Sequence, residues 1–427
     1  MSAEEKFDAI IVGAGPAGTA CAYLLAKEGK SVLVIERGVS AGSKNVTGGR
    51  MYTYALELVE PGLHAEAPLE RQVVREQIMM MSQESAMTVD YFDLTYSGEV
   101  PQSYTILRAP FDEWFAGKAE EQGAMLAAGI KVDDLIIENE KVVGVKAGDD
   151  EMYADVVIAA DGVNSFLAQK AGLRQDINQH VVGVGVKEII ELPADIIEKR
   201  FNVGKDQGAA RTIVGCTQGV QGGGFLYTNR DSISLGVVFN PKSAAKNGKK
   251  IHEIMQDFKL HPAIQPLIAD GITVEYGAHL VPEQGWRAVP SKLYREGMLV
   301  IGDAAGFCLN TGTIIRGIDL AIVSGVAAAR AIICAINPAQ SGSAYMAELE
   351  KLKLIPTMKL FAGWPDLLEN PRMVTKYPEM INAMLNFMFK VDGNVPEKMN
   401  KAMLKIVKQH VSMKELLSDG WKGVKAI

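Results

Sequence analysis

A cluster of glycines near the N-terminus has the spacing that lets a peptide backbone approach a phosphate group closely. The turn is formed by Gly13, Gly15, Pro16, Ala17 and Gly18. It lies between an apolar run, 9–12, and an alanine-rich stretch, 17–27, which is the order strand, turn and helix of a dinucleotide-binding fold. The free N–H groups at the start of such a helix attract a pyrophosphate. The pattern therefore predicts a bound dinucleotide.

An acidic residue follows at the position where such folds bind a ribose. The apolar stretch 31–35 ends in Glu36, 23 residues after Gly13, and Arg37 comes next. A carboxylate there can accept hydrogen bonds from both ribose hydroxyls, and it would repel a 2′-phosphate. FAD or NAD is therefore favoured over NADP.

Two further apolar runs end in aspartate and glycine much later in the chain. One ends at Asp161 and Gly162, and the other runs into Gly302 and Asp303. Ligands of open α/β sheets bind at the carboxyl ends of the strands, where these carboxylates would lie. Asp303 is predicted to accept hydrogen bonds from ribityl hydroxyls, and a helix over about 313–336 to stabilise negative charge on a flavin ring. Glycine-rich elements so far apart suggest one long cofactor, and FAD fits better than a nicotinamide.

Composition excludes several functional classes. The chain has 427 residues, a net charge of −7 and a pI near 5.6, which argues against a nucleic-acid partner. Its four cysteines form no C-x-x-C pair, so a sequence-local zinc or iron–sulfur motif is excluded and no metal site is expected. The acidic start lacks the features of a signal peptide, which predicts a cytoplasmic protein, and any membrane contact is expected to be peripheral.

Longer strings resemble one branch of the large FAD-binding fold shared by hydroxylases and geranylgeranyl reductases. They are SAGSKNVTGGRMY (40–52), GGGFLYTN (222–229), VIGDAAGFCLNTG (300–312) and ENPRM (369–373). These strings resemble the FixC family of electron transfer flavoprotein:quinone oxidoreductase-like proteins, over essentially the whole chain. The resemblance implies FAD, electron transfer from FixA- and FixB-like electron transfer flavoprotein subunits to a quinone, and a ferredoxin-like FixX subunit with an iron–sulfur cluster. It also raises the possibility of an electron-bifurcating complex.

The resemblance adds candidate flavin contacts. They are Lys44, Asn45, Gly48, Gly49, Arg108, Thr311 and Gly312. Arg108 is expected at the start of a helix, where it would pair with a phosphate or a ribityl oxygen. Lys44 has an alternative interpretation as a solvated surface charge. The flavin carries the chemistry in such proteins, so no catalytic acid or base is predicted.

One departure from the related hydroxylases bears on the electron donor. Those enzymes continue the Asp-Gly strand end as D-G-x-x-S-x-x-R, whereas Ala168 stands here in place of the arginine. A hydroxylase that uses NADPH is therefore less favoured. The alternative function is an NADPH- or ferredoxin-dependent hydroxylase or geranylgeranyl reductase on the same fold. A third hypothesis is a flavin-holding subunit that assembles partners and has no substrate site.

The predicted fold class is α/β, and α+β in part. We expect a discontinuous, Rossmann-like FAD-binding domain of the glutathione-reductase/hydroxylase type over 1–95, 105–180 and 290–340. An inserted antiparallel-sheet domain on the quinone side is expected over 180–290, including a hairpin that turns at 229–231. A helical region, 340–427, would face partners or the membrane.

Two C-terminal segments carry the attachment hypothesis. The stretch 380–389 is apolar nearly all round, so it is either core or the wall of a channel for a quinone tail. The stretch 397–417 has a basic amphipathic pattern. It would lie on an anionic membrane, dock an acidic ferredoxin or pack on its own domain.

Overall fold

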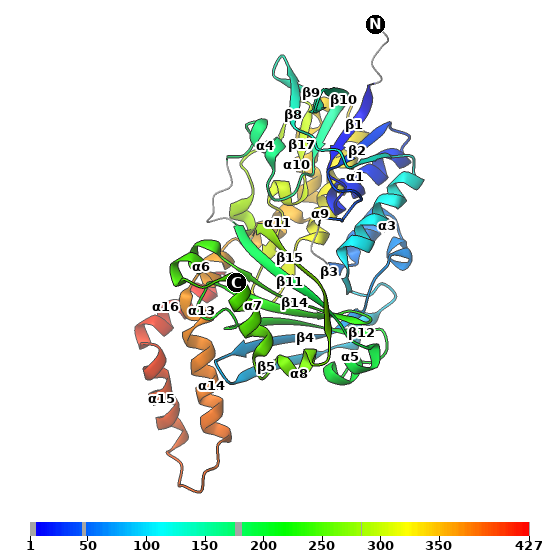
Figure 1. The fold of residues 1–427 in the computed structure, drawn as a ribbon. Helices are drawn as coiled ribbons and strands as arrows, with labels where there is room; N and C mark the ends of the chain where they lie inside the picture. The colour runs from blue at the N-terminus through cyan, green and yellow to red at the C-terminus, as the bar shows by residue number, and fades with distance from the viewer. Residues whose placement is uncertain (1–5, 45–47, 176–181, 283, 427) are drawn as a thin grey trace.

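Two sheets joined by long helices make up the body of the molecule, and a pair of helices projects from it (Figure 1). The structure is a computed structural model, and it describes residues 6–44, 48–175, 182–282 and 284–426. The mixed α/β architecture agrees with the predicted fold class.

The first sheet is built around parallel strands. Across the sheet the order is β16 (Tyr294–Arg295), β17 (Met298–Val300), β10 (Asp150–Ala159), β1 (Phe7–Val12), β2 (Val32–Glu36) and β7 (Met125–Ala128), with β9 (Lys141–Ala147) and β8 (Asp134–Glu138) attached to β10. Each of the four strands β1, β2, β10 and β17 contains a run of buried apolar residues, as parallel strands usually do. Their carboxyl ends lie at one edge, as the sequence predicted.

Long helices pack on this sheet. They are α1 (Pro16–Lys27), α3 (Arg108–Glu121), α9 (Ile318–Cys334) and α10 (Gly342–Lys351), and the short α2 (Tyr54–Val59) and α4 (Phe166–Lys170) lie beside them. Helix α9 packs along α1 and also reaches β3 of the second sheet. It therefore links the two halves of the molecule.

The second sheet has nine strands. Its order is β15 (Ile272–Pro282), β11 (Val182–Glu191), β14 (Ser232–Phe239), β13 (Gly222–Thr228), β12 (Gln207–Val214), β4 (Gln72–Met81), β6 (Ser103–Ile106) and β3 (Gly49–Tyr52), with β5 (Ala86–Phe92) attached to β4. Strands β13 and β14 form the predicted hairpin. Helices α5 (Ala194–Phe201), α6 (Pro241–Asn247), α7 (Ile251–Leu260) and α8 (Gln265–Ile268) lie beside this sheet.

This sheet differs from the expectation in two ways. It takes strands from 49–106 as well as from 182–282, so it is not confined to 180–290. The pairing of β4 with β12 is parallel, whereas an antiparallel domain was expected. The reason is that residues more than a hundred positions apart form this pairing, and no local turn announces it in the sequence.

Helices make up the C-terminal region. They are α11 (Leu354–Leu360), α12 (Trp364–Leu368), α13 (Pro371–Val374), α14 (Lys376–Phe389), α15 (Met399–His410) and α16 (Met413–Ala426). The basic stretch 397–417 is therefore divided between α15 and α16. Helices α14 and α15 form the projecting hairpin in Figure 1. Of the helices in the described ranges, none is long and apolar enough to cross a bilayer.

Candidate functional site

The N-terminal glycine turn is folded so tightly that side chains are excluded from it. Gly13 has a φ of +110°, and a Cβ there would lie 2.3 Å from the carbonyl oxygen of Ala160. A Cβ on Gly18 would lie 2.0 Å from the carbonyl oxygen of Gly13. These contacts press the end of β1 against the end of β10, while Pro16 and Ala17 begin α1 directly after the turn. The backbone is thus available to a phosphate group.

Glu36 ends β2 beside that turn. Its Oε2 accepts a hydrogen bond from the Ala14 N–H at 3.0 Å, and its Oε1 accepts one from the Gly38 N–H at 2.6 Å. The carboxylate is therefore held next to the first turn of α1, where a ribose would lie. The neighbouring Arg37 is exposed.

The glycine turn after β17 meets the N-terminal one. Gly302 has a φ of +62°, and a Cβ there would lie 2.8 Å from the Cβ of Ala17. Its N–H donates to Ser324 Oγ of α9 at 2.8 Å. The two glycine-rich elements, remote in the sequence, are therefore brought into direct contact by α1 and α9.

Two carboxylates, Asp161 and Asp303, lie at the ends of β10 and β17. Asp161 Oδ2 accepts a hydrogen bond from the Leu167 N–H at 3.0 Å, whereas Oδ1 is buried and has no partner among the described residues. Burial raises the pKa of both carboxyl groups, and Arg174 opposes the rise at each of them. A buried acceptor without a protein donor fits a ligand that carries hydroxyl groups, such as the ribityl and ribose parts of FAD.

Arg108 begins α3, as the sequence predicted. Its Nη2 and Nε donate to the two carboxylate oxygens of Asp112 at 2.7 and 3.0 Å. Its charge also lowers the pKa of Asp303 against the effect of burial. The guanidinium is thus fixed by Asp112 and influences the cofactor edge of the first sheet.

The glycine-bearing segment around residue 48 connects the two sheets. Gly48 has a φ of +90°, and a Cβ there would lie 2.3 Å from Ser234 Oγ of β14. A Cβ on Gly49 would lie 3.1 Å from Ile318 at the start of α9. Lys44 is exposed, and Asn45 lies outside the described residues.

The other two predicted contacts, Thr311 and Gly312, lie just before α9. They belong to the turn between β18 (Leu309–Asn310) and β19 (Ile315–Arg316). The Gly312 N–H donates to Asn310 Oδ1 at 2.8 Å, and the Thr311 N–H donates to the Ile314 carbonyl at 3.0 Å. The turn precedes the N-terminus of α9, the end that was expected to face a flavin. Gly162 lies in the turn after β10, with a φ of +74° and no atom within 4 Å of the position of a Cβ.

Some residues of this region were not singled out by sequence reasoning. Arg174 donates to the Ala304 carbonyl at 2.9 Å and is electrostatically coupled to Asp161 and Asp303. Lys187 and His279, from β11 and β15, lie close enough to Arg108 that its charge lowers the pKa of each. No motif contains these residues, because their proximity depends on sheet pairing.

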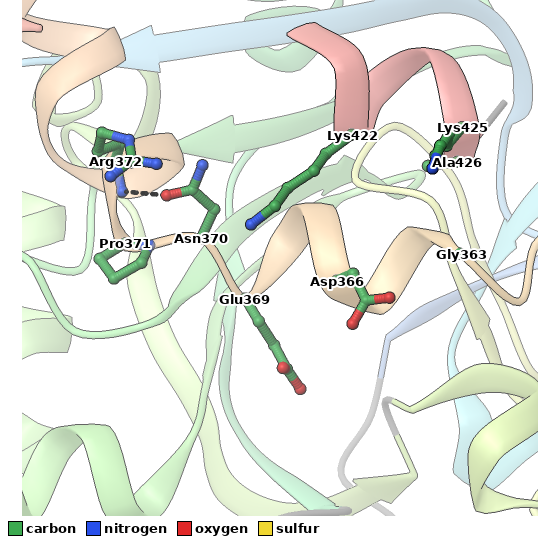
Figure 2. A pocket seen from close by; sticks show the side chains of 9 residues that line it. All are labelled: Gly363, Asp366, Glu369, Asn370, Pro371, Arg372, Lys422, Lys425 and Ala426. Atoms are coloured by element: carbon green, nitrogen blue, oxygen red, sulfur yellow. Dashed lines mark hydrogen bonds between the residues drawn. The ribbon is translucent and has the colours of Figure 1, made fainter. Parts of the chain in front are cut away.

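A separate cavity of about 610 Å³ lies between the C-terminal helices (Figure 2). Its lining comes from 363–372 and 422–426 and includes none of the predicted cofactor residues. Asp366 is paired with Arg287, and Arg372 is paired with Asp419. We therefore assign this cavity to the packing of the C-terminal helices and not to the cofactor site.

Three family models match the chain. The model described as "FAD binding domain" covers residues 6–218, the one described as "ETF-QO, ubiquinone-binding" covers 182–281, and the one described as "ETF-QO/FixC family C-terminal domain" covers 364–427. The first match confirms the predicted cofactor, FAD.

Curated relatives match over nearly the full length. A probable electron transfer flavoprotein-quinone oxidoreductase of Escherichia coli (strain K12), YdiS, is 46% identical over 99% of this chain and 100% of its own. The protein FixC of Salmonella typhi is 46% identical over 99% of both chains.

Solved structures share the fold at much lower identity. A geranylgeranyl bacteriochlorophyll reductase-like protein from Thermoplasma acidophilum aligns with a TM-score of 0.67 at 19% identity, over 97% of this chain and 100% of its own. The flavin-dependent brominase Bmp2 aligns with a TM-score of 0.61 at 18% identity, over 95% of this chain and 100% of its own. At such identities the similarity concerns the fold alone.

Proposed function

The chain belongs to the ETF-QO/FixC family of FAD-dependent oxidoreductases, and from this membership we propose that it passes electrons from an electron transfer flavoprotein through FAD to a quinone. Bound FAD would accept the electrons and release them in pairs. The chain's own residues would bind the cofactor, exclude water and set the charge around it.

The observation that carries the proposal is the contact between the two matched regions. The ubiquinone-binding match covers β11, β12, β13, β14 and most of β15. Those strands meet the FAD-binding half where Gly48 lies against Ser234 and Lys187. A quinone bound on this side of the second sheet would therefore lie beside the cofactor.

Most of the predicted residues have a role under this proposal. The turn 13–18 and α1 would bind the pyrophosphate, Glu36 the adenosine ribose, and Asp161 and Asp303 the ribityl and phosphate region. Arg108 would compensate negative charge there, and the turn 311–312 would present the start of α9 to the flavin. Arg37, Lys44 and Asn45 have no specific role under the proposal, and like the other site residues they remain predictions. The FAD-binding, quinone-side and helical regions would follow the proposed domain division, except that the strands of 49–106 belong to the second sheet.

The alternative donor, NADPH, has less support. Ala168 occupies the arginine position of the hydroxylase motif and is completely buried in α4. The geranylgeranyl reductase-like neighbour supports only the shared fold.

Anaerobic stopped-flow kinetics test the proposal. The FAD-loaded protein is mixed separately with a reduced electron transfer flavoprotein and with NADPH, and then with a menaquinone analogue. We expect fast flavin reduction by the flavoprotein, reoxidation by the quinone and no reduction by NADPH. Reduction by NADPH alone would contradict the proposal and favour the hydroxylase or geranylgeranyl reductase. A protein that takes no electrons from either donor would favour the assembly-subunit hypothesis.

Peripheral membrane contact is the second part of the proposal, because quinones reside in membranes. The tip of the α14–α15 hairpin exposes Met388, Phe389, Val391, Val395 and Met399. Lys390, Lys398 and Lys401 are exposed around them. Asp392 and Glu397 are also exposed there, so the lysines leave a small net positive charge. Exposed apolar side chains with such surroundings fit insertion into the interface of an anionic bilayer. We propose that this tip places the protein on the cytoplasmic face of the membrane.

A FixX-like ferredoxin partner and an electron-bifurcating complex are the last part of the proposal, and family membership is their support. Co-purification of the chain with candidate FixA-, FixB- and FixX-like subunits, followed by iron analysis, tests it. Isolation of the chain alone from cells that express all four proteins would argue against such a complex.

A further inference from the structure

Lys187 lies on the inner face of the second sheet, toward the FAD-binding half. Its Nζ donates a hydrogen bond to the Gly48 carbonyl at 3.0 Å and lies 5.4 Å from the centre of the Phe225 ring. The next residue, Glu188, points to the opposite face and pairs with Lys259 of α7. The ammonium group of Lys187 is therefore fixed between β11, β13 and the segment that leads into β3.

The surroundings of Lys187 contain more positive than negative groups. Arg108 of α3 acts electrostatically on Lys187 and on His279 of β15, and Lys187 also acts on His279. Glu275 of β15 is the acid that acts on Lys187. Asp303 lies beyond Arg108 and is coupled to it, while Asp112 is already bound to Arg108. Register places Lys187, Glu275 and His279 on one face of the sheet.

These surroundings make the charge of Lys187 sensitive to its environment. Burial and the charge of Arg108 lower the pKa of Lys187 to about 8, and Glu275 opposes them. Burial, Arg108 and Lys187 lower the pKa of His279 to about 4, so His279 is neutral at pH 7. Near neutral pH the local positive charge therefore comes from Arg108 and Lys187.

The position of Gly48 connects this charge to the cofactor site. Gly48 accepts the Lys187 hydrogen bond, and the adjoining Gly49 lies against Ile318 at the N-terminus of α9. The same Arg108 that acts on Lys187 also acts on Asp303 at the end of β17. Reduction of FAD bound at this edge adds negative charge to the site, and that charge would act on Lys187.

We infer that Lys187 is a positioning residue for the FAD site: its ammonium group holds the Gly48 carbonyl, and its protonation is coupled to the redox state of the site. Where Lys187 is neutral before reduction, its amine takes one proton from water when electrons enter, and it returns that proton when the electrons leave. No other bond is formed or broken at Lys187, and the electrons stay with the cofactor. The inference rests on FAD binding and not on the identity of the electron donor or acceptor.

The sign of the effect follows from linkage. Below about pH 8, Lys187 is charged in both redox states and stabilises the reduced site by a constant amount. Added negative charge raises its pKa, so in a window above about pH 8 reduction is accompanied by uptake of an extra proton. The FAD midpoint potential should fall more steeply with pH in this window. Above the window Lys187 is neutral in both states and its effect disappears.

Spectroscopic redox titrations between pH 6.5 and 10 test the inference, with a chemical reductant and reference dyes. We compare the wild type with Lys187→Met, which removes the charge, and Lys187→Arg, which keeps it at every pH. At pH 7 the potential of Lys187→Met should be lower than that of the wild type, and the two should converge at high pH. Lys187→Arg should stay above Lys187→Met throughout, with no steeper window.

Lys259→Met is the matched control, because Lys259 pairs with Glu188 on the other face of the same strand. Its potentials should equal those of the wild type. The inference would be overturned if the plots of midpoint potential against pH were parallel for the wild type and Lys187→Met, or if the two potentials were equal at pH 7. This comparison requires that FAD content and circular dichroism are unchanged. If Lys187→Met does not retain FAD, Lys187→Arg decides: a steep window that persists in Lys187→Arg would assign the proton to another group. Because no electron transfer flavoprotein or quinone is used, failure here is distinguishable from failure of the proposed function.

Discussion

A Cβ on Gly325 would lie 2.2 Å from the carbonyl oxygen of Ala17, so helices α9 and α1 touch backbone to backbone. This contact holds the N-terminal glycine turn against the turn at Gly302. The cofactor site thus depends on a residue in the middle of a helix, well away from either glycine motif.

Gly325→Ala should therefore damage cofactor binding from a distance. The added methyl group would clash with the backbone of α1, which cannot rotate away as a side chain can. We therefore expect a loss of about 1–3 kcal/mol in the free energy of unfolding and weaker FAD retention. Thermal unfolding and flavin absorbance measure both. Gly117→Ala is the control, because a Cβ there meets nothing within 4 Å and should be neutral or stabilise α3 by up to about 1 kcal/mol. Equal behaviour of the two variants would contradict the close packing.

Glu36→Gln should weaken FAD binding and cost about 1 kcal/mol of stability, because only one of the two oxygens that accept backbone N–H groups remains. The amide keeps one acceptor oxygen for the backbone N–H groups but loses the charge that strengthens hydrogen bonds to ribose hydroxyls. We expect a Kd about tenfold higher, since bonds to charged groups contribute about 1–2 kcal/mol more than neutral ones. Flavin fluorescence titration of the apoprotein measures it. Glu28→Gln, on an exposed residue after α1, should bind as the wild type does.

The hairpin tip should direct binding to anionic vesicles. Val395 is 97% and Phe389 77% exposed, so Phe389→Ser with Val395→Ser removes surface apolar groups without opening a cavity. In flotation assays the wild type should bind phosphatidylglycerol vesicles better than phosphatidylcholine vesicles, and the double variant should bind neither. Leu260→Ser, 54% exposed on α7, is the control. Unchanged flotation of the double variant would exclude this tip as the membrane contact. If the double variant instead lost the binding of a ferredoxin, the tip would be a contact for that protein.

Thiol labelling should report one fast-reacting cysteine. Cys334 is exposed, whereas Cys21, Cys216 and Cys308 are buried. Burial raises the pKa of the Cys216 thiol to about 12 and raises that of Cys21 further, so neither forms a thiolate at pH 8. A chromogenic disulfide reagent should modify one thiol in the native protein and all four in denaturant. Cys334→Ser should remove the native signal; a signal that persists would show that a buried site opens.

The docking of α16 should be stable to acid until the pH falls below about 4. Arg372 donates to both carboxylate oxygens of Asp419 at 2.6 Å, and this holds the pKa of Asp419 below its ordinary 3.8. A lowered folded-state pKa means that the pair stabilises the fold above pH 3.8 and that this contribution is lost as pH falls through the folded value. Asp419→Asn should therefore lower the free energy of opening of residues 413–426 by about 1–2 kcal/mol. Amide hydrogen exchange at pH 7 measures this change, and it should become faster in this segment.

The control for Asp419 is the exposed pair Lys390 and Asp392, whose atoms are 3.7 Å apart. Asp392→Asn should change hydrogen exchange little, because exposed pairs contribute about 0–1 kcal/mol. If both variants protect α16 as the wild type does, the Arg372 contact does not hold this helix.

The amino-acid sequence by itself determined the parts of this protein that depend on local order. The turn 13–18, the strand before it and the helix after it are specified by neighbouring residues, because glycine conformation and helix N-termini are local properties. Glu36, Asp161 and Asp303 could be placed because strands of a parallel sheet end at one edge.

Only the tertiary structure decided which distant residues meet. Lys187, His279 and Arg174 reach the cofactor region through strand register and helix packing, and neither leaves a periodic signal in a single sequence. The addition of 49–106 to the second sheet rests on the parallel pairing of β4 with β12, which no turn residue specifies. The burial of Met380 and the exposure of Phe389 in one apolar helix were decided in the same way, because the body of the protein covers only the first part of α14.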